Sequence, residues 1–372
     1  MSTALVIGGG IMGLLTAREL ARAGASVTLV EMGSTGRESS WAGGGILSTL
    51  SPWHYSEPVT ALVRWSQRCY RELCGELLEE TGIDPEYCRD GLLALEDADP
   101  TAALDWGREH GMPIEVLDEA MVGRLAPNLA HGLDRALWLP EIAHVRNPRL
   151  IKAIRRAIGR SVRVCEHQEV LELLTKGGRV SGVRTRTDIY HADTVVVCAG
   201  AWTATLLEGL GQVPAIEPVR GQMLLFHASP AMLRQVVLAD GHYAIPRRDG
   251  SILFGSTLEQ TGFAKETTSD AKERLRDKAV ELLPLLRRTP VGRHWAGLRP
   301  GSPSGIPYIG PHPAIGNLFV NAGHFRYGLT MAPASARLVT DLILHRQPIV
   351  PAAPYRLDAD RRATEGGRPH SG

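Results

Sequence analysis

The chain has 372 residues, of which 44% are hydrophobic, and its 41 basic and 40 acidic side chains leave a formal net charge of +1. This length favours about two domains, and the balanced charge argues against nucleic acid or an anionic membrane surface as the main partner. No apolar run approaches the roughly 20 residues that cross a bilayer, so we expect a soluble protein without a membrane partner.

The start of the chain and its cysteines predict a cytoplasmic location. Met1 leads through Ser2 and Thr3 directly into an apolar strand, without the basic segment or cleavage site of a secretory signal. The five cysteines form neither a C-x-x-C pair nor a group with histidines at zinc-ligand spacing. We therefore expect free thiols in a reducing compartment and no metal site.

The first 31 residues have the sequence of a mononucleotide-binding unit. The apolar residues 4–7 predict a buried strand, which stops at the G-x-G-x-x-G formed by Gly8, Gly10 and Gly13. A helical pattern and a second strand follow, and that strand ends in Glu31. This order of strand, helix and strand argues against the alternative that the glycines form only a turn without a ligand.

Each part of this unit suits a bound dinucleotide. Gly8 makes the tight turn, Gly10 lets the backbone approach a pyrophosphate, and Gly13 lets helix and strand pack closely. The helix N-terminus presents free amides to the phosphates. Glu31 is placed to accept from ribose hydroxyls and would repel a 2′-phosphate, which disfavours NADP. FAD and NAD share this pattern, so the unit alone leaves both open.

The next segments mix loops with regular elements. Residues 39–46 are mostly small or hydroxyl-bearing, too flexible for a regular element, and suited to close backbone approach to a ligand. Apolar spacing predicts a helix over 59–80. Residues 90–143 predict short strands and helices, and the acidic run 96–99 predicts a solvated surface.

Strands and helices continue to alternate toward the C-terminus. The expected elements are a helix over 147–158, a strand over 162–164, half of a hairpin over 180–185, a strand from 194 ending in a small-residue turn at 198–202, strands over 223–226, 243–247 and 251–255, a helix over 272–286, a strand over 317–323 and a helix over 332–344. The three strands between 223 and 255 predict an antiparallel sheet.

These elements predict an α/β fold with a discontinuous Rossmann-like dinucleotide-binding domain and an inserted α+β substrate domain built on an antiparallel sheet. The nucleotide domain is expected to comprise residues 1–85, 145–215 and 290–350, and the substrate domain residues 86–144 and 216–289. The polar end of the chain, residues 358–372, predicts a flexible tail.

Three C-terminal motifs complete a recognisable set. W-A-G-L-R-P-G at 295–301 is followed by P-Y-I-G at 307–310 and G-H-F-R-Y-G at 323–328. Together with the N-terminal unit, C-A-G-A-W at 198–202 and P-V-R-G-Q at 218–222, these motifs resemble the D-amino-acid-oxidase-like family of FAD amine oxidases, and within it the bacterial glycine oxidases of thiamine biosynthesis. The resemblance extends to about residue 358.

The resemblance implies non-covalent FAD, because the segment that tethers flavin to a cysteine in sarcosine-oxidase-like relatives holds no cysteine here. Gly323 and Gly328 flank a turn that opens a helix, whose N-terminus would stabilise negative charge on a reduced flavin. The residues that would line FAD are Gly8, Gly10, Ile11, Met12, Gly13, Glu31, Met32, Ser39, Ser40, Gly44, Gly45, Ile46, Val170, Gly200, His324, Phe325, Arg326, Tyr327, Gly328, Leu329 and Thr330.

The resemblance also implies the substrate contacts. Arg299 would hold a carboxylate by two parallel charge-assisted bonds, Tyr243 would add a phenolic hydrogen bond, and Arg326 would lie close by. The alternatives are a surface ion pair for Arg299, simple strand packing for Tyr243 and a structural contact to the flavin for Arg326. His242 and His324 are expected to be structural or polar contacts rather than general bases.

The implied reaction is oxidation of glycine, sarcosine or small D-amino acids. A hydride passes from the substrate Cα to the flavin, the imine hydrolyses to glyoxylate or a keto acid and ammonia, and dioxygen reoxidises the flavin to give hydrogen peroxide. Alternatives are a D-amino-acid dehydrogenase, a cyanide-forming glycine dehydrogenase subunit, a non-catalytic flavoprotein module and an NAD-dependent dehydrogenase. Relatives imply a homo-oligomer, a tetramer. Leu258, expected in the pocket wall, and the bulky Trp41 leave the preferred substrate open.

Overall fold

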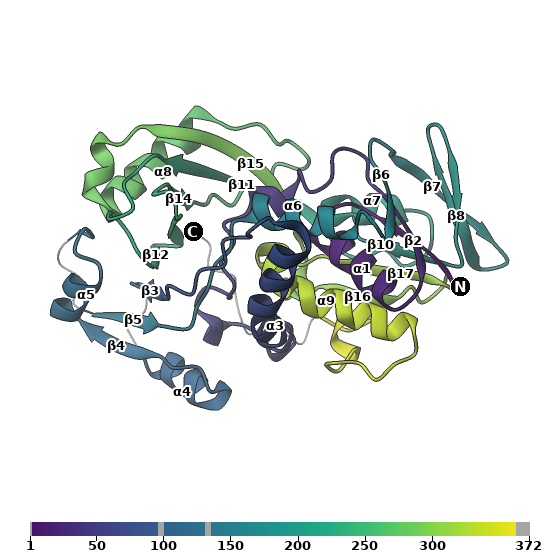
Figure 1. The fold of residues 1–372 in the computed structure, drawn as a ribbon. Helices are drawn as coiled ribbons and strands as arrows, with labels where there is room; N and C mark the ends of the chain where they lie inside the picture. Colours follow the sequence, from purple (N-terminus) through teal and green to yellow (C-terminus); the bar gives the residue numbers. More distant parts are fainter. Residues whose placement is uncertain (1, 96–99, 131–134, 362–372) are drawn as a thin grey trace.

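The computed structural model describes residues 2–95, 100–130 and 135–361, which are organised around two large β-sheets (Figure 1). The first is a six-stranded sheet in which all neighbours are parallel except the edge strand β16. In spatial order its strands are β16 (Tyr308–Pro311), β17 (Leu318–Ala322), β10 (Thr194–Val197), β1 (Thr3–Ile7), β2 (Ser26–Val30) and β6 (Val162–Cys165). This confirms the expected Rossmann-like α/β architecture.

Alternation along β1 supplies a core to each face of this sheet. Ala4 and Val6 pack against α1 (Ile11–Arg22), α3 (Glu57–Thr81), α6 (Asn147–Ile158) and α9 (Gly328–Ile343). Leu5 and Ile7 face a small three-stranded sheet and a short helix. These are β7 (Val170–Lys176), β8 (Arg179–Thr185), β9 (Ile189–His191) and α7 (Thr203–Leu207).

Helix α9 begins earlier than the sequence pattern predicts, at Gly328 instead of residue 332. Pro333 lies inside it and has no N–H to donate to the carbonyl of Leu329 one turn back. The hydroxyl of Tyr70 on α3 donates to that carbonyl instead, and the Ser66 Oγ accepts from the Ala334 N–H at 3.1 Å. Helix α3 therefore satisfies the backbone groups that the proline disturbs.

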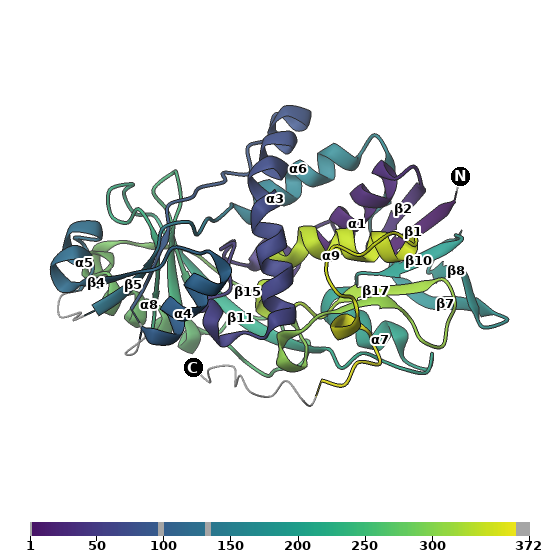
Figure 2. The same cartoon turned by 90° about the horizontal axis from the view of Figure 1, so that it is seen from below.

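The second sheet has eight strands and is antiparallel except where β12 pairs with β3. In spatial order its strands are β15 (Val291–Gly301), β11 (Glu217–Phe226), β14 (Ile252–Gly255), β13 (His242–Pro246), β12 (Val236–Ala239), β3 (Leu92–Ala94), β5 (Arg135–Leu139) and β4 (Glu115–Asp118). Helices α8 (Ser269–Leu282) and α5 (Glu119–Leu125) pack on one face and α4 (Thr101–His110) on the other. Figure 2 shows α3 standing between this sheet and the parallel one.

The remaining short helices are α2 (Ser39–Ala42), η1 (Pro52–His54), η2 (Gly200–Trp202), η3 (Pro284–Arg288), η4 (Pro303–Gly305), η5 (Phe325–Tyr327) and η6 (Ala353–Tyr355). Within the described residues, no helix has the length and apolar character needed to cross a membrane.

Three expectations require correction. Strand β15 was placed with the nucleotide domain (290–350) but pairs with β11 in the antiparallel sheet. The helix expected over 272–286 ends at Leu282, because Pro284 cannot continue it and starts a 3₁₀ turn. The tail expected from 358 is fixed at its beginning, since Arg361 is buried over the Tyr308 ring and donates to the Pro307 carbonyl at 3.0 Å. The acidic run 96–99 and the rest of the tail, 362–372, lie outside the described residues.

Candidate active site

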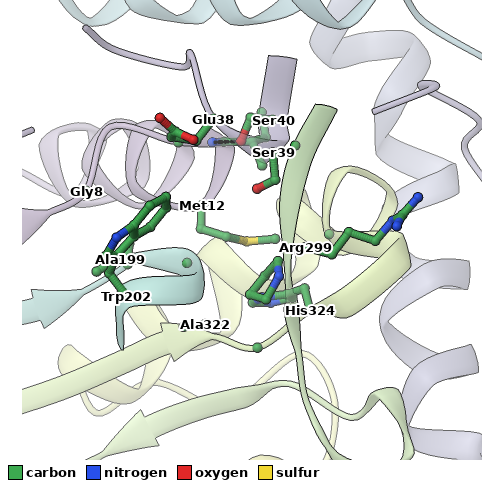
Figure 3. Close-up of a pocket in the computed structure, with 18 of the residues that line it drawn as sticks. Gly8, Met12, Glu38, Ser39, Ser40, Ala199, Trp202, Arg299, Ala322 and His324 are labelled. Atoms are coloured by element: carbon green, nitrogen blue, oxygen red, sulfur yellow. Dashed lines mark hydrogen bonds between the residues drawn. The ribbon is translucent and has the colours of Figure 1, made fainter. Parts of the chain in front are cut away.

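A cavity of about 690 Å³ opens at the carboxyl edge of the parallel sheet, where β1, β2, β10 and β17 end, and reaches β11, β13 and β15 of the antiparallel sheet (Figure 3). In open α/β sheets this edge is where ligands bind. Its wall contains the predicted site residues Gly8, Gly10, Ile11, Met12, Glu31, Met32, Ser39, Ser40, Gly44, Gly45, Ile46, Val170, Gly200, Tyr243, Arg299, His324, Phe325, Arg326, Tyr327, Gly328, Leu329 and Thr330.

The glycines of the first turn are required by close backbone contacts. Gly8 has a φ of +104°, and a Cβ there would overlap the carbonyl of Cys198. A Cβ on Gly13 would overlap the carbonyl oxygen of Gly8. Gly13 is needed for this close contact, as expected, but the cavity wall does not include it, although it was also expected to line FAD. Gly10 caps α1 and lines the cavity, where its lack of a side chain exposes the backbone to a ligand.

Glu31 is buried at the end of β2, and both of its carboxylate oxygens accept backbone bonds. The Gly9 N–H donates to Oε2 at 2.6 Å and the Gly33 N–H donates to Oε1 at 2.8 Å. These bonds fix the carboxylate while leaving each oxygen a lone pair toward the cavity. An immobile acceptor at this position suits ribose hydroxyls.

The segment 39–46 is better ordered than its composition predicts, since Ser39–Ala42 forms one helical turn, α2. The Ser40 Oγ accepts from the Ile11 N–H at 2.9 Å, and Asn147 donates to the Ser40 carbonyl at 3.1 Å. Arg247, buried beside this segment, donates to the Gly44 carbonyl at 2.6 Å. Desolvation lowers the pKa of Arg247 to about 10, so it stays cationic at neutral pH.

The turn before α9 brings residues 324–330 to the cavity. His324 is buried and its Nε2 contacts the Ser335 hydroxyl at 2.9 Å; burial lowers the pKa of His324 to about 3, so the ring is neutral. Thr330 donates to the Ile46 carbonyl at 2.9 Å, and the hydroxyl groups of Tyr327 and Tyr55 share a short hydrogen bond. His242, outside the cavity wall, contacts the Asp240 carbonyl at 2.7 Å.

Hydrogen bonds to the protein fix the Arg299 guanidinium in the cavity wall. It donates to the Ser256 Oγ at 2.6 Å and to the Thr257 carbonyl at 3.1 Å, and the Tyr243 hydroxyl donates to the same Ser256 Oγ at 3.2 Å. Desolvation lowers the pKa of Arg299, while the neighbouring Tyr243 acts in the opposite direction. The charge of Arg326, which also lines the cavity, lowers the pKa of Arg299 further. Two guanidinium groups and a phenol therefore form an anion-binding end to the cavity.

Sequence reasoning missed several residues that build this end. Ser256 joins Arg299 to Tyr243, and a Cβ on Gly221 would overlap the Arg299 guanidinium. Both residues lie far from Arg299 in the sequence, and only the pairing of β11 with β15 and β14 reveals them. The expectation that Leu258 lines the pocket was wrong, because the described cavity wall does not include it. The bulky Trp41 is also outside that wall and packs edge-on against Trp295, with 5.6 Å between the ring centroids.

The donor set of the cavity fits a dinucleotide with a flat ring system. The α1 N-terminus and the glycine turn offer backbone amides to a pyrophosphate, and Glu31 offers acceptors to a ribose. Buried Oδ1 atoms of Asn147 and Asn321, both in the cavity wall, have no hydrogen-bond partner within the described structure. A polar ligand supplies such partners.

A second group of potential ligands lies outside the cavity. Cys88, Asp90 and His144 place one ligand atom each within 4.8 Å of one another, although the sequence predicts no metal site. Arg247 donates to Nδ1 of His144 at 3.3 Å, so Nε2 carries the ring proton and faces Asp90 at 3.6 Å. This tautomer favours a histidine–carboxylate contact over cation binding.

The sequence and fold match known proteins over most of their length. The family pattern described as FAD dependent oxidoreductase (DAO) matches residues 3–342. The chain is 50% identical to the glycine oxidase of Pseudomonas aeruginosa over 94% of its own length and 97% of that protein. It is 30% identical to the bifunctional ThiO/ThiG protein of Trichormus variabilis, covering 92% of this chain and 53% of that one. The crystal structure of glycine oxidase from Geobacillus kaustophilus superposes with a TM-score of 0.91 at 28% identity, covering 97% of this chain and all of that one.

Proposed function

The chain belongs to the DAO family of FAD-dependent oxidoreductases, and from this premise we propose that it oxidises glycine and other small amines, such as sarcosine and small D-amino acids. The observation that carries the proposal is the fixed Arg299 guanidinium beside Tyr243, in the same cavity as the dinucleotide cradle. Its relatives in Pseudomonas aeruginosa and Geobacillus kaustophilus, both named glycine oxidase, support this substrate class.

FAD fits the cavity through the residues already described. Gly8, Gly10 and the α1 N-terminus would hold its diphosphate, Glu31 a ribose, and the segments 39–46 and 324–330 its ring system. When bound, FAD supplies the acceptor for the substrate's Cα hydride and passes the electrons to dioxygen. Cys198 is the one cysteine in the described cavity wall, and burial raises its pKa to about 12. Its thiol stays protonated, which supports non-covalent binding.

The protein's part in the reaction is orientation. Arg299 and Tyr243 would hold the substrate carboxylate, and Arg326 would add positive charge nearby. His324 takes no proton at neutral pH, so it does not serve as the acceptor of the amine proton. Oxidation of glycine with dioxygen and water yields glyoxylate, ammonia and hydrogen peroxide in equal amounts.

The test is the visible spectrum of the purified protein under anaerobic conditions, before and after addition of glycine, sarcosine or D-alanine. Bleaching that reverses in air with peroxide formation supports the oxidase, and the fastest substrate identifies its preference. Bleaching that persists in air indicates a dehydrogenase with another acceptor. A flavin band that responds to none of the three contradicts the proposal.

The cellular context is part of the same proposal. All five cysteines are free, which supports a reducing cytoplasm. The resemblance to bacterial glycine oxidases supports a homotetramer and a role in thiamine biosynthesis. Size-exclusion chromatography with light scattering tests the first, and growth of a deletion strain without thiamine tests the second.

A further inference from the structure

The segment between β14 and α8 connects the substrate-binding end of the cavity with its other walls. It begins at Ser256 and Thr257, which contact Arg299, and ends at Thr268, whose hydroxyl caps α8 by accepting from the Ala271 N–H. Between these ends, residues 262–267 are all exposed. The segment is thus attached to the site at its start and lies on the surface in its middle.

A polar network fixes both ends of this segment to β11. The buried Arg220 pairs with Glu259 at 2.5 Å, and Gln222 donates to Glu259 at 2.9 Å. The Thr268 N–H donates to the Gln222 side-chain oxygen at 2.9 Å. Because these side chains are largely desolvated, their bonds hold both ends of the segment firmly to β11.

Two side chains of the exposed middle reach the cavity wall. Lys265 contacts both carboxylate oxygens of Glu38, at 2.9 and 3.1 Å. Two residues earlier, the Phe263 ring lies 5.6 Å from that of Trp202. Glu38 and Trp202 both line the cavity, and they come from different elements, the turn before α2 and the turn η2. Figure 3 shows them on separate parts of the wall.

The Lys265–Glu38 and Phe263–Trp202 contacts both suit a cavity that binds an anionic, aromatic ligand. Glu38 lies two residues before Ser40, whose Oγ accepts from the Ile11 N–H at the N-terminus of α1, so an uncompensated carboxylate there would repel a diphosphate bound at that N-terminus. Lys265 neutralises this carboxylate. Phe263 remains 46% exposed while its ring contacts that of Trp202, a poor arrangement for core packing and a suitable one for supporting the cavity wall from outside.

We propose that residues 257–268 form a strap on the outer side of the cavity wall, fastened by Lys265 to Glu38 and by Phe263 to Trp202, which holds these parts of the wall together and so retards the dissociation of FAD. The proposal uses the family's cofactor and does not depend on which amine is oxidised. A failure of the amine assay therefore leaves it standing, and its own failure leaves the amine assay unaffected.

The test measures the rate constant of FAD dissociation, followed by the rise of free-flavin fluorescence after dilution, for Phe263→Ala, Lys265→Ala and the double variant. An exposed ion pair and an aromatic contact are each worth up to about 1 kcal/mol. We expect a two- to fivefold faster release for each single variant and about five- to thirtyfold for the double variant. Lys265→Arg, which keeps the charge, should remain near the parent.

Two controls separate a strap from a general loss of stability. Lys278→Ala removes the same charge on α8, where Lys278 pairs with Glu281 at 2.8 Å, and should release FAD at the parent rate. The melting temperature of the apoprotein should be equal in all variants, because Phe263 and Lys265 are exposed. A double variant that keeps the parent rate, or one whose apoprotein melts lower in proportion to its faster release, would overturn the proposal.

Discussion

Replacing Ser256 by alanine tests how the protein aims its carboxylate anchor. The Ser256 Oγ accepts from Arg299 at 2.6 Å and from the Tyr243 hydroxyl at 3.2 Å, so the variant releases both groups that we propose to bind the substrate carboxylate. A hydrogen bond to a charged group contributes about 1.5–3 kcal/mol. Arg299 keeps its bond to the Thr257 carbonyl, so we expect the substrate to lose about 1.5–2 kcal/mol of binding free energy, near the lower end of this range. This corresponds to a tenfold to thirtyfold fall in kcat/KM for glycine.

The fall should appear mainly as a rise in KM. The carboxylate does not change during hydride transfer, so Arg299 binds it equally in the ground state and the transition state. Steady-state oxygen uptake gives kcat and KM, and an anaerobic spectral titration with acetate, a carboxylate without an amine, gives the anchor's affinity directly. Acetate binding should weaken by a similar factor.

Ser181→Ala is the matched control, because Ser181 is an exposed serine on β8 that donates only to a backbone carbonyl at 3.1 Å. It should behave like the parent. If Ser256→Ala keeps KM and acetate affinity within twofold of the parent, the Thr257 and Arg220 carbonyls, which accept from Arg299 at 3.1 and 3.4 Å, are sufficient to aim Arg299, and the reasoning is refuted. Loss of FAD affinity in parallel would show a structural defect instead.

Three further variants address other parts of the site. Arg299→Lys keeps the positive charge but cannot make two parallel hydrogen bonds to a carboxylate, so kcat/KM should fall about a hundredfold. The control is Arg293→Lys, at an exposed position on the same strand, which should have no effect in the same assay. Gly13→Ala places a Cβ against the Gly8 carbonyl and should lower the free energy of unfolding by about 2 kcal/mol or more in urea titrations. In His324→Gln, the third variant, the pH dependence of stability should change. The pKa of His324 is about 3 in the folded protein and 6.5 in the unfolded chain, so the unfolded chain takes up a proton as the pH falls below 6.5, and the free energy of unfolding decreases by about 1.4 kcal/mol by pH 5.5. The apoprotein of His324→Gln should not show this decrease.

Local sequence was sufficient for elements whose cause is local. The strand, glycine turn and helix at the N-terminus follow from apolar periodicity and from contacts between near neighbours such as Gly8 and Gly13. The roles of Ser256 and Gly221 depend on which strands pair, and the pairing of β15 with β11 is not encoded near either residue. The early start of α9 likewise depends on Tyr70, which satisfies the carbonyl that Pro333 leaves open.

Strand β13 connects the proposed substrate end of the cavity with the loop 39–46 of the proposed cofactor site. Alternate residues of a strand point to one side, and Tyr243, Ile245 and Arg247 all contact Gly44. A Cβ added at Gly44 would lie 3.0 Å from the Tyr243 ring and 2.7 Å from Ile245. Arg247 donates to the Gly44 carbonyl. Strand β13 and the residue that follows it therefore connect the proposed substrate contact, Tyr243, with the proposed cofactor loop at Gly44. A side chain at residue 44 would push β13 away and disturb both, so selection for a larger substrate pocket must act elsewhere.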